Sequence, residues 1–102
     1  MIKAKFKSWS CYVVFTKYRD NDRIAILLKD TSDSGPVATA TINLPDVKLK
    51  EDEVIIKDYS ENEGMVKCLL EAGVISSVIA YVKTGFVTVP ICKLNMNLNE
   101  LQ

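Results

Sequence analysis

The chain has 102 residues, 48% of them hydrophobic and 25% charged, and its 13 basic and 13 acidic residues cancel to zero net charge. This apolar content excludes an intrinsically disordered chain, and the length suits a single domain over residues 1–102, with residues 1–7 and 95–102 fraying at the ends. The balanced charge argues against a general nucleic-acid binder, whose affinity depends on a basic surface, and against an acidic mimic of DNA.

The cysteines Cys11, Cys68 and Cys92 form no CxxC pair, and the chain contains no histidine. The odd cysteine count and the absence of a secretory signal in "MIKAKFKSWS" predict a cytoplasmic protein with three buried free thiols. No apolar run approaches the roughly 20 residues of a membrane span, so we expect no membrane contact. Without histidine, the commonest general base and metal ligand is missing, and we expect no cofactor, no metal and no enzymatic activity.

The N-terminal half predicts consecutive strands joined by short turns. Residues 8–18 and 23–30 are rich in β-branched and aromatic side chains, and the polar residues between them are typical of a turn. Residues 37–44 alternate with a period of two, which predicts a half-buried strand whose inward side chains are Ala38, Ala40, Ile42 and Leu44. Pro45 ends this strand because proline cannot donate a backbone hydrogen bond, and residues 54–57 predict a fourth, short strand.

The polar stretch "DYSENEG", residues 58–64, connects that strand to a helix predicted over residues 61–72. Ser60 and Glu63 match the S-x-x-E capping box, in which the serine hydroxyl accepts from the backbone N–H three residues later. Gly73 is expected to end the helix in the left-handed conformation. Gly64, inside the predicted helix, costs about 1 kcal/mol relative to alanine.

The C-terminal part, residues 74–94, is apolar and β-prone, with a bend or tight turn at Gly85. Pro90 predicts that its strand is an edge strand or contains a bulge. Together these patterns predict an α+β domain, an antiparallel sheet of about five strands with one main helix packed on one face.

Four residues of the 58–64 connection exceed what a strand-to-helix turn requires: Asp58, Tyr59, Glu61 and Asn62. Tyrosine offers a large rigid contact area with a polar tip, and a helix N-terminus tolerates nearby acids. We therefore predict that these four residues bind a protein partner. The alternative is that the stretch only connects the strand to the helix, with Tyr59 packing at the helix entry.

Carboxylates are the remaining candidates for chemistry, and they fall into two groups: Glu51, Asp52 and Glu53, and then Asp58, Glu61 and Glu63. Two acids can divide the roles of general acid and general base when their environments separate their pKa values. Nothing in the sequence forces such burial, so an enzyme is the least favoured of the functions considered.

Several motifs in order resemble a known family: "ATATINLPD" at residues 38–46, "DEVIIKDYSENEGMV" at 52–66, "LLEAGVI" at 69–75 and "TGFVTVPICKL" at 84–94. They are similar to a family of small domains of unknown function (domain of unknown function 4313) found on conjugative elements and prophages of gut bacteria. The resemblance covers most of residues 12–94. It implies no assigned activity, and it implies a helper role, such as action against host defences.

We therefore expect a non-enzymatic accessory protein of a mobile genetic element or phage that binds a host or element protein. The resemblance implies an inhibitor of a host defence nuclease, an anti-CRISPR-like protein acting on an effector such as Cas9. The alternative is a small nucleic-acid-binding module that uses the basic N-terminal strand, where lysines lie near aromatic side chains. Strand alternation places Tyr12 on the face opposite Trp9 and Phe15, so these rings do not form one stacking platform.

Overall fold

The computed structural model describes residues 2–95, and the fraying expected at residues 1 and 96–102 lies outside this range. Its elements in chain order are β1 (Lys3–Phe6), β2 (Trp9–Lys17), β3 (Ile24–Asp30), β4 (Pro36–Thr39), β5 (Glu53–Ile55), the 3₁₀ helix η1 (Ser60–Asn62), α1 (Met65–Glu71), β6 (Ile75–Thr84) and β7 (Val87–Leu94). The α+β class is confirmed.

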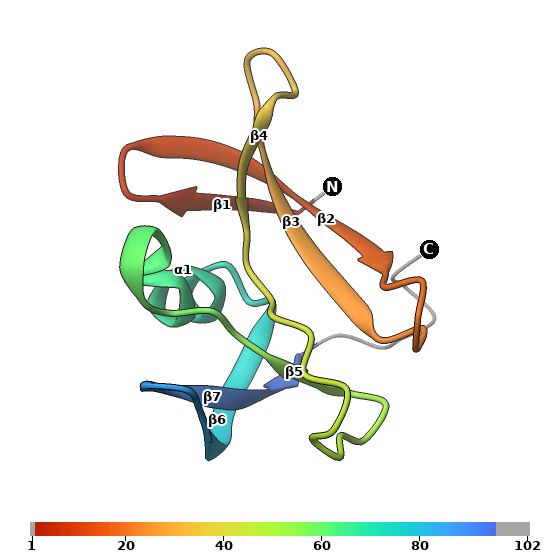
Figure 1. Ribbon diagram of the computed structural model, residues 1–102. Helices are drawn as coiled ribbons and strands as arrows, with labels where there is room; N and C mark the ends of the chain where they lie inside the picture. The colour runs from red at the N-terminus through yellow and green to blue at the C-terminus, as the bar shows by residue number, and fades with distance from the viewer. Residues whose placement is uncertain (1, 96–102) are drawn as a thin grey trace.

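The strands form two antiparallel sheets rather than one sheet of about five strands. The first has the order β1-β2-β3-β4 and the second the order β5-β7-β6. In Figure 1 the first sheet lies above the second, and α1 lies beside both; α1 contacts β1 and β6. The expected sheet of about five strands is therefore only partly matched. The first sheet ends at β4, and an isolated β-bridge between Thr41 and Ile56 joins the segments that follow β4 and β5.

The first sheet begins earlier than the sequence led us to expect. Lys3 and Lys5 are exposed, whereas Ala4 and Phe6 are buried, so β1 has the alternation of a half-buried strand. It pairs with β2 from Lys3 opposite Tyr12 to Phe6 opposite Trp9. Residues 3–6 are therefore an ordered strand, in a segment that we expected to fray.

The predicted strand at 37–44 is shorter than expected, because β4 ends at Thr39. Ala40 is fully buried as predicted, but Thr41, predicted to face solvent, is only 4% exposed. The Thr41 hydroxyl accepts from the Ile26 N–H at 3.2 Å and shares a 2.8 Å hydrogen bond with the Tyr18 hydroxyl. These bonds satisfy a buried polar group and fix the segment at which the chain crosses between the sheets.

Pro90 lies in β7, the central strand of the second sheet, so of the two predicted alternatives the edge strand is wrong. The register between β6 and β7 shifts between Val78 and Ala80, next to the Tyr81–Pro90 pair, which agrees with the alternative of a bulge. The Ile56 N–H donates to the Pro90 carbonyl oxygen at 3.0 Å, but proline can return no hydrogen bond. β5 ends at Ile55, directly before this point. The missing donor therefore falls where the β5–β7 ladder stops, which explains why a central strand tolerates the proline.

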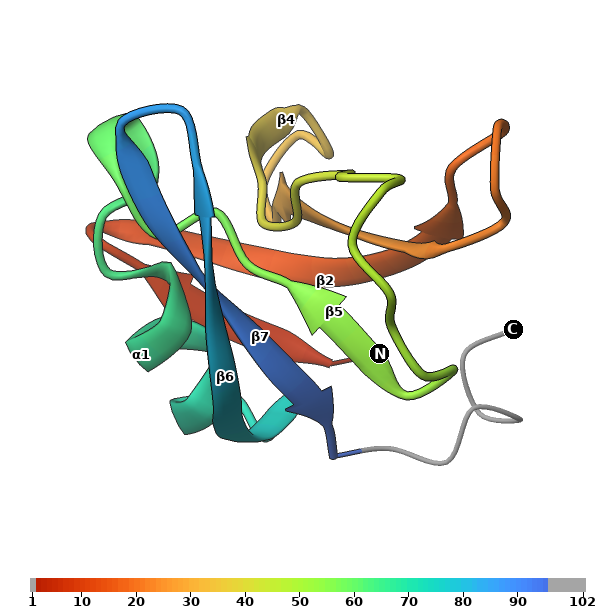
Figure 2. The same cartoon turned by 60° about the horizontal axis from the view of Figure 1, so that its bottom comes forward.

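The hydrophobic core combines buried side chains from both sheets and from α1, and Figure 2 shows these elements in a turned view. Met65 and Leu69 of α1 are four residues apart, share one side of the helix and are fully buried. Gly73 has φ +76°, and the N–H groups of Gly73 and Val74 donate to the carbonyl oxygens of Leu70 and Leu69. This pair of bonds is the Schellman motif, so the predicted C-terminal signal is confirmed.

Cys11, Cys68 and Cys92 are free and buried, as predicted. Burial raises the pKa of the Cys68 thiol to about 11 and that of the Cys92 thiol to about 12. These side chains are therefore protonated at neutral pH and act as small apolar groups in the core. They are also unreactive, because the thiolate is the reactive form.

Candidate functional site

The connection between β5 and α1 differs from the predicted capping box. Residues 60–62 form the 3₁₀ helix η1, and α1 begins only at Met65. Ser60 has φ +57° and makes no side-chain capping bond to either helix. Gly64 precedes α1 with φ +96°, a conformation that glycine adopts without the strain of a Cβ atom. The prediction that Ser60 and Glu63 cap a helix starting at residue 61 is therefore wrong.

Asp58 caps α1 instead. One carboxylate oxygen accepts from the backbone N–H groups of Gly64 at 2.6 Å and Met65 at 3.1 Å, and the other accepts from Val66 at 3.4 Å. The first N–H groups of a helix have no partner within the helix, and an anion at that end also interacts favourably with the helix dipole. The Asp58 side chain is thus held by the helix, and its predicted role in binding a partner stays a prediction.

Asn62 also has a structural role. Its side chain is 3% exposed, and its Nδ2 donates to the carbonyl oxygen of Thr39 at 2.7 Å. This bond fastens η1 to the end of β4. Asn62 therefore positions the connection against the first sheet, and its amide is already engaged.

Tyr59 and Glu61 lie on the outside of the same turn. Glu61 forms a 2.8 Å ion pair with Lys57, whose Nζ lies 5.4 Å from the centroid of the Tyr59 ring. Its hydrogen bond with Glu61 raises the pKa of Lys57, and the same bond lowers the pKa of Glu61. Both groups are therefore charged at neutral pH, and the surface around Tyr59 is less acidic than the sequence suggested.

The basic β1–β2 turn reaches this surface as well. Lys7, which has φ +55°, donates from Nζ to the backbone carbonyl oxygen of Glu61 at 2.8 Å. The contact joins two segments 54 residues apart in the chain. One lysine of the basic N-terminal strand region thus supports the turn.

Tyr59, Glu61 and Asn62 line one wall of a pocket of about 470 Å³. The rest of the lining comes from Lys57 and from residues between Tyr18 and Asn43: Tyr18, Val37, Ala38, Thr39, Thr41, Ile42 and Asn43. We call this the Tyr59 pocket. The sequence indicated the turn but not these other lining residues, because no local pattern shows that Tyr18 lies near residue 59.

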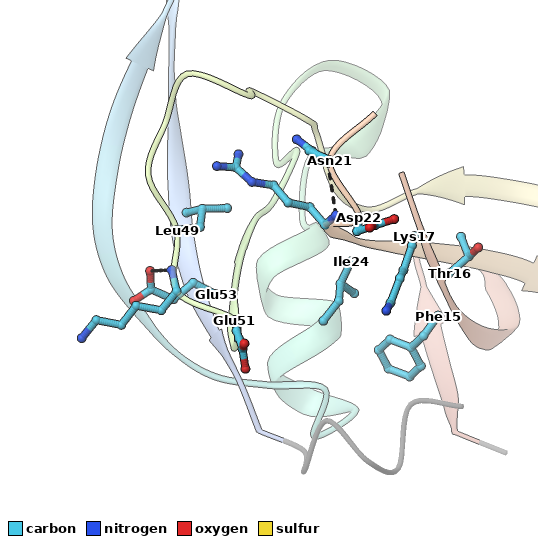
Figure 3. Close-up of a pocket in the computed structure, with 11 residues that line it drawn as sticks. Phe15, Thr16, Lys17, Asn21, Asp22, Ile24, Leu49, Glu51 and Glu53 are labelled. Atoms are coloured by element: carbon cyan, nitrogen blue, oxygen red, sulfur yellow. Dashed lines mark hydrogen bonds between the residues drawn. The ribbon is translucent and has the colours of Figure 1, made fainter. Parts of the chain in front are cut away.

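A second pocket of about 520 Å³ lies between the end of the β2–β3 hairpin and residues 49–53. Figure 3 shows Phe15 and Ile24 on one side and Leu49 and Glu51 on the other. The Arg23 guanidinium donates to the carbonyl oxygens of Leu44 and Val47. These bonds hold the loop that leads into residues 49–53, so Arg23 stabilises this side of the pocket.

Four of the six acids considered for catalysis have structural partners: Asp52, Glu53, Asp58 and Glu61. Asp52 pairs with Lys93 at 3.2 Å, and a Glu53 carboxylate oxygen accepts from the Lys50 N–H at 2.8 Å. Asp58 caps α1 as described above. Within residues 2–95 no three metal-binding side chains gather into a group that could hold an ion. Asp52, Glu53 and Asp58 thus stabilise loops and a helix end.

No family model, no curated protein and no solved structure matches this chain. The resemblance based on its motifs therefore stays a prediction. In the described part of the chain, no helix has the length and apolar character needed to cross a membrane.

Proposed function

We propose that the protein is a non-enzymatic accessory protein of a mobile genetic element or phage that binds a protein partner through the Tyr59 pocket. The observation that carries this proposal is the position of Tyr59. Its aromatic side chain stands half-buried at the wall of a 470 Å³ hollow built from three separate segments of the chain. Aromatic anchors beside a pocket are typical of the residues that dominate protein–protein affinity.

The turn that carries Tyr59 is rigid before any partner arrives. Asp58 fixes its end to α1, Asn62 fixes it to β4, and Lys7 fixes the Glu61 carbonyl group. Binding therefore orders few additional groups, and a preorganised surface retains more of its contact energy as affinity.

The lining of the pocket combines apolar side chains with an ion pair whose two charges can contact a partner. Val37, Ala38 and Ile42 supply apolar lining, and the Lys57–Glu61 pair supplies one charge of each sign. The Glu61 side chain is 64% exposed, and a surface ion pair of this kind contributes little to stability because water screens it. Both charges can therefore turn toward a partner at little cost to the fold.

The resemblance to a mobile-element family supports a particular class of partner, a host defence nuclease such as Cas9. The test is DNA cleavage by purified, guide-loaded Cas9 with increasing amounts of this protein. The informative variant combines Tyr59→Ala with Glu61→Ala and leaves Asp58 and Asn62 in place, because changing those two would disturb the fold. We expect at least about tenfold weaker inhibition, or 1.4 kcal/mol of binding free energy.

The matched control is Phe86→Ala, which removes a fully exposed aromatic side chain at the tip of the β6–β7 hairpin. It should inhibit like the parent, and all three proteins should have closely similar melting temperatures. Equal inhibition by parent and double variant would exclude the Tyr59 pocket as the binding site. A parent without effect on Cas9 would refute this partner, and binding to single-stranded DNA with a steep salt dependence would favour the nucleic-acid alternative.

A further inference from the structure

The outer edge of β6 is the longest open strand edge in the structure. β6 spans ten residues and pairs with β7 on one side, and within residues 2–95 no strand pairs with its other side. Large side chains are exposed along it, with Ile79 at 47% and Tyr81 at 67%. A long edge of this kind is a template for pairing with another strand.

The hydrogen-bond register shows which backbone groups of β6 face outward. Thr84 and Val87 close the two-residue loop, so the backbone N–H and C=O groups of Thr84 face β7. Because these groups alternate in direction along a strand, those of Tyr81 and Lys83 face the opposite side. Pro90 supports this assignment independently. It lies opposite Tyr81, and its carbonyl oxygen accepts from Ile56 on the β5 side. The N–H and C=O groups of Tyr81 and Lys83 therefore point away from the sheet.

The other sheet edges are less suited to pairing. β1 carries exposed Lys3 and Lys5, and the Thr39 carbonyl oxygen at the end of β4 is occupied by Asn62. Lysines on an edge strand oppose pairing with other chains. β5 has only three residues. β6 contains a single charged residue, Lys83, and both of its register irregularities lie before Ala80, so residues 80–84 form a regular ladder.

We propose that a second copy of this chain pairs with β6 in the antiparallel direction, with the two-fold axis at Val82. Tyr81 of each copy then lies opposite Lys83 of the other, and their outward N–H and C=O groups form four backbone hydrogen bonds. The two three-stranded sheets become one continuous six-stranded sheet. The charges select this arrangement, because each lysine meets an aromatic ring, whereas parallel pairing in register would place Lys83 beside Lys83.

The test is the oligomeric state of the full chain, measured by sedimentation equilibrium over a concentration series. The parent is expected to associate to a dimer. Tyr81→Lys places two like charges opposite each other and should weaken the dimer at least about tenfold. Tyr81→Glu removes the same ring but places a carboxylate opposite Lys83 of the other copy, so its dimer should be tighter than that of Tyr81→Lys. The Tyr81→Lys, Lys83→Glu double variant also restores opposite charges, and its dimer should be no tighter than that of Tyr81→Glu.

Trp9→Lys is the matched control, since it replaces another exposed aromatic side chain, 48% exposed and located on the first sheet, with the same cation. It should leave the dimer unchanged. Circular dichroism checks that every variant is folded. A parent that remains a monomer at about 1 mM overturns the proposal, because the dissociation constant would then exceed any useful range. A dimer that Tyr81→Lys and Tyr81→Glu weaken equally, or not at all, overturns the proposed register.

Discussion

Replacing Asp58 should destabilise the protein although the residue lies outside every helix and strand. Asp58→Ala removes the acceptor for the N–H groups of Gly64, Met65 and Val66. Loss of a helix cap costs about 0.5–2 kcal/mol, and the ionised acceptor and the three donors place this site at the upper end. We therefore expect a loss of about 2 kcal/mol for alanine and about 1 kcal/mol for Asp58→Asn, which keeps one acceptor oxygen.

Urea denaturation followed by circular dichroism measures this difference directly. A loss of 2 kcal/mol corresponds to a fall of about 8–16 °C in melting temperature for a chain of this size. Ser60→Ala is the matched control, because Ser60 lies in the same turn and makes no capping bond. Its cost should stay below about 0.5 kcal/mol. If Asp58→Ala has the same free energy of unfolding as the parent, or if Ser60→Ala lowers it more than Asp58→Ala does, the capping assignment is wrong.

Two further predictions concern buried groups. Thr41→Val leaves the Ile26 N–H and the Tyr18 hydroxyl without their partner and should lower the free energy of unfolding by about 1–3 kcal/mol, measured by urea denaturation. The double variant with Tyr18→Phe should lose less than the two single variants together, and strict additivity would argue against a shared bond. Burial holds the pKa of Cys68 and Cys92 above their usual value of 9.0, so the native state keeps protons that the unfolded state releases, and stability should fall as the pH rises above about 9; a flat profile from pH 8 to 10.5 would contradict the burial of these thiols.

Local patterns predicted the elements whose signals are contained in a few neighbouring residues. The β-branched and aromatic run became β2, the stripe of Met65 and Leu69 became the buried face of α1, and Gly73 ended the helix. The strand β1 was also predictable, because Lys3 and Lys5 alternate with Ala4 and Phe6, but its high charge concealed the alternation.

The features that the sequence did not reveal depend on contacts between distant residues. Ser60 and Glu63 match a capping box by spacing, yet the bond from Asn62 to Thr39 holds residues 60–62 in a 3₁₀ turn that excludes it. The helix can start only after that turn, within reach of Asp58. Likewise, the period-two pattern of a strand shows which side chains are buried but not which sheet the strand joins, so the division into two sheets was not predictable.

The lining of the Tyr59 pocket also depends on contacts between residues that are distant in the chain. Tyr18 reaches it because its hydroxyl bonds Thr41, 23 residues away in the chain. The sequence therefore indicated that residues 58–62 were unusual and could not show what they face. Two of the four predicted binding residues, Asp58 and Asn62, proved to hold the turn that presents the other two.

The strand order of the second sheet has a consequence for biosynthesis. β5 pairs with β7, and Glu53 lies opposite Lys93, so β5 must wait for 40 more residues before its partner exists. At about 5–20 residues per second, a ribosome takes about 2–8 s to add them. β1 to β4 can pair as they emerge, because each neighbours the next in sequence. Val54 and Ile56, both buried in the finished protein, therefore cannot be covered by a complete second sheet until β7 has left the ribosome.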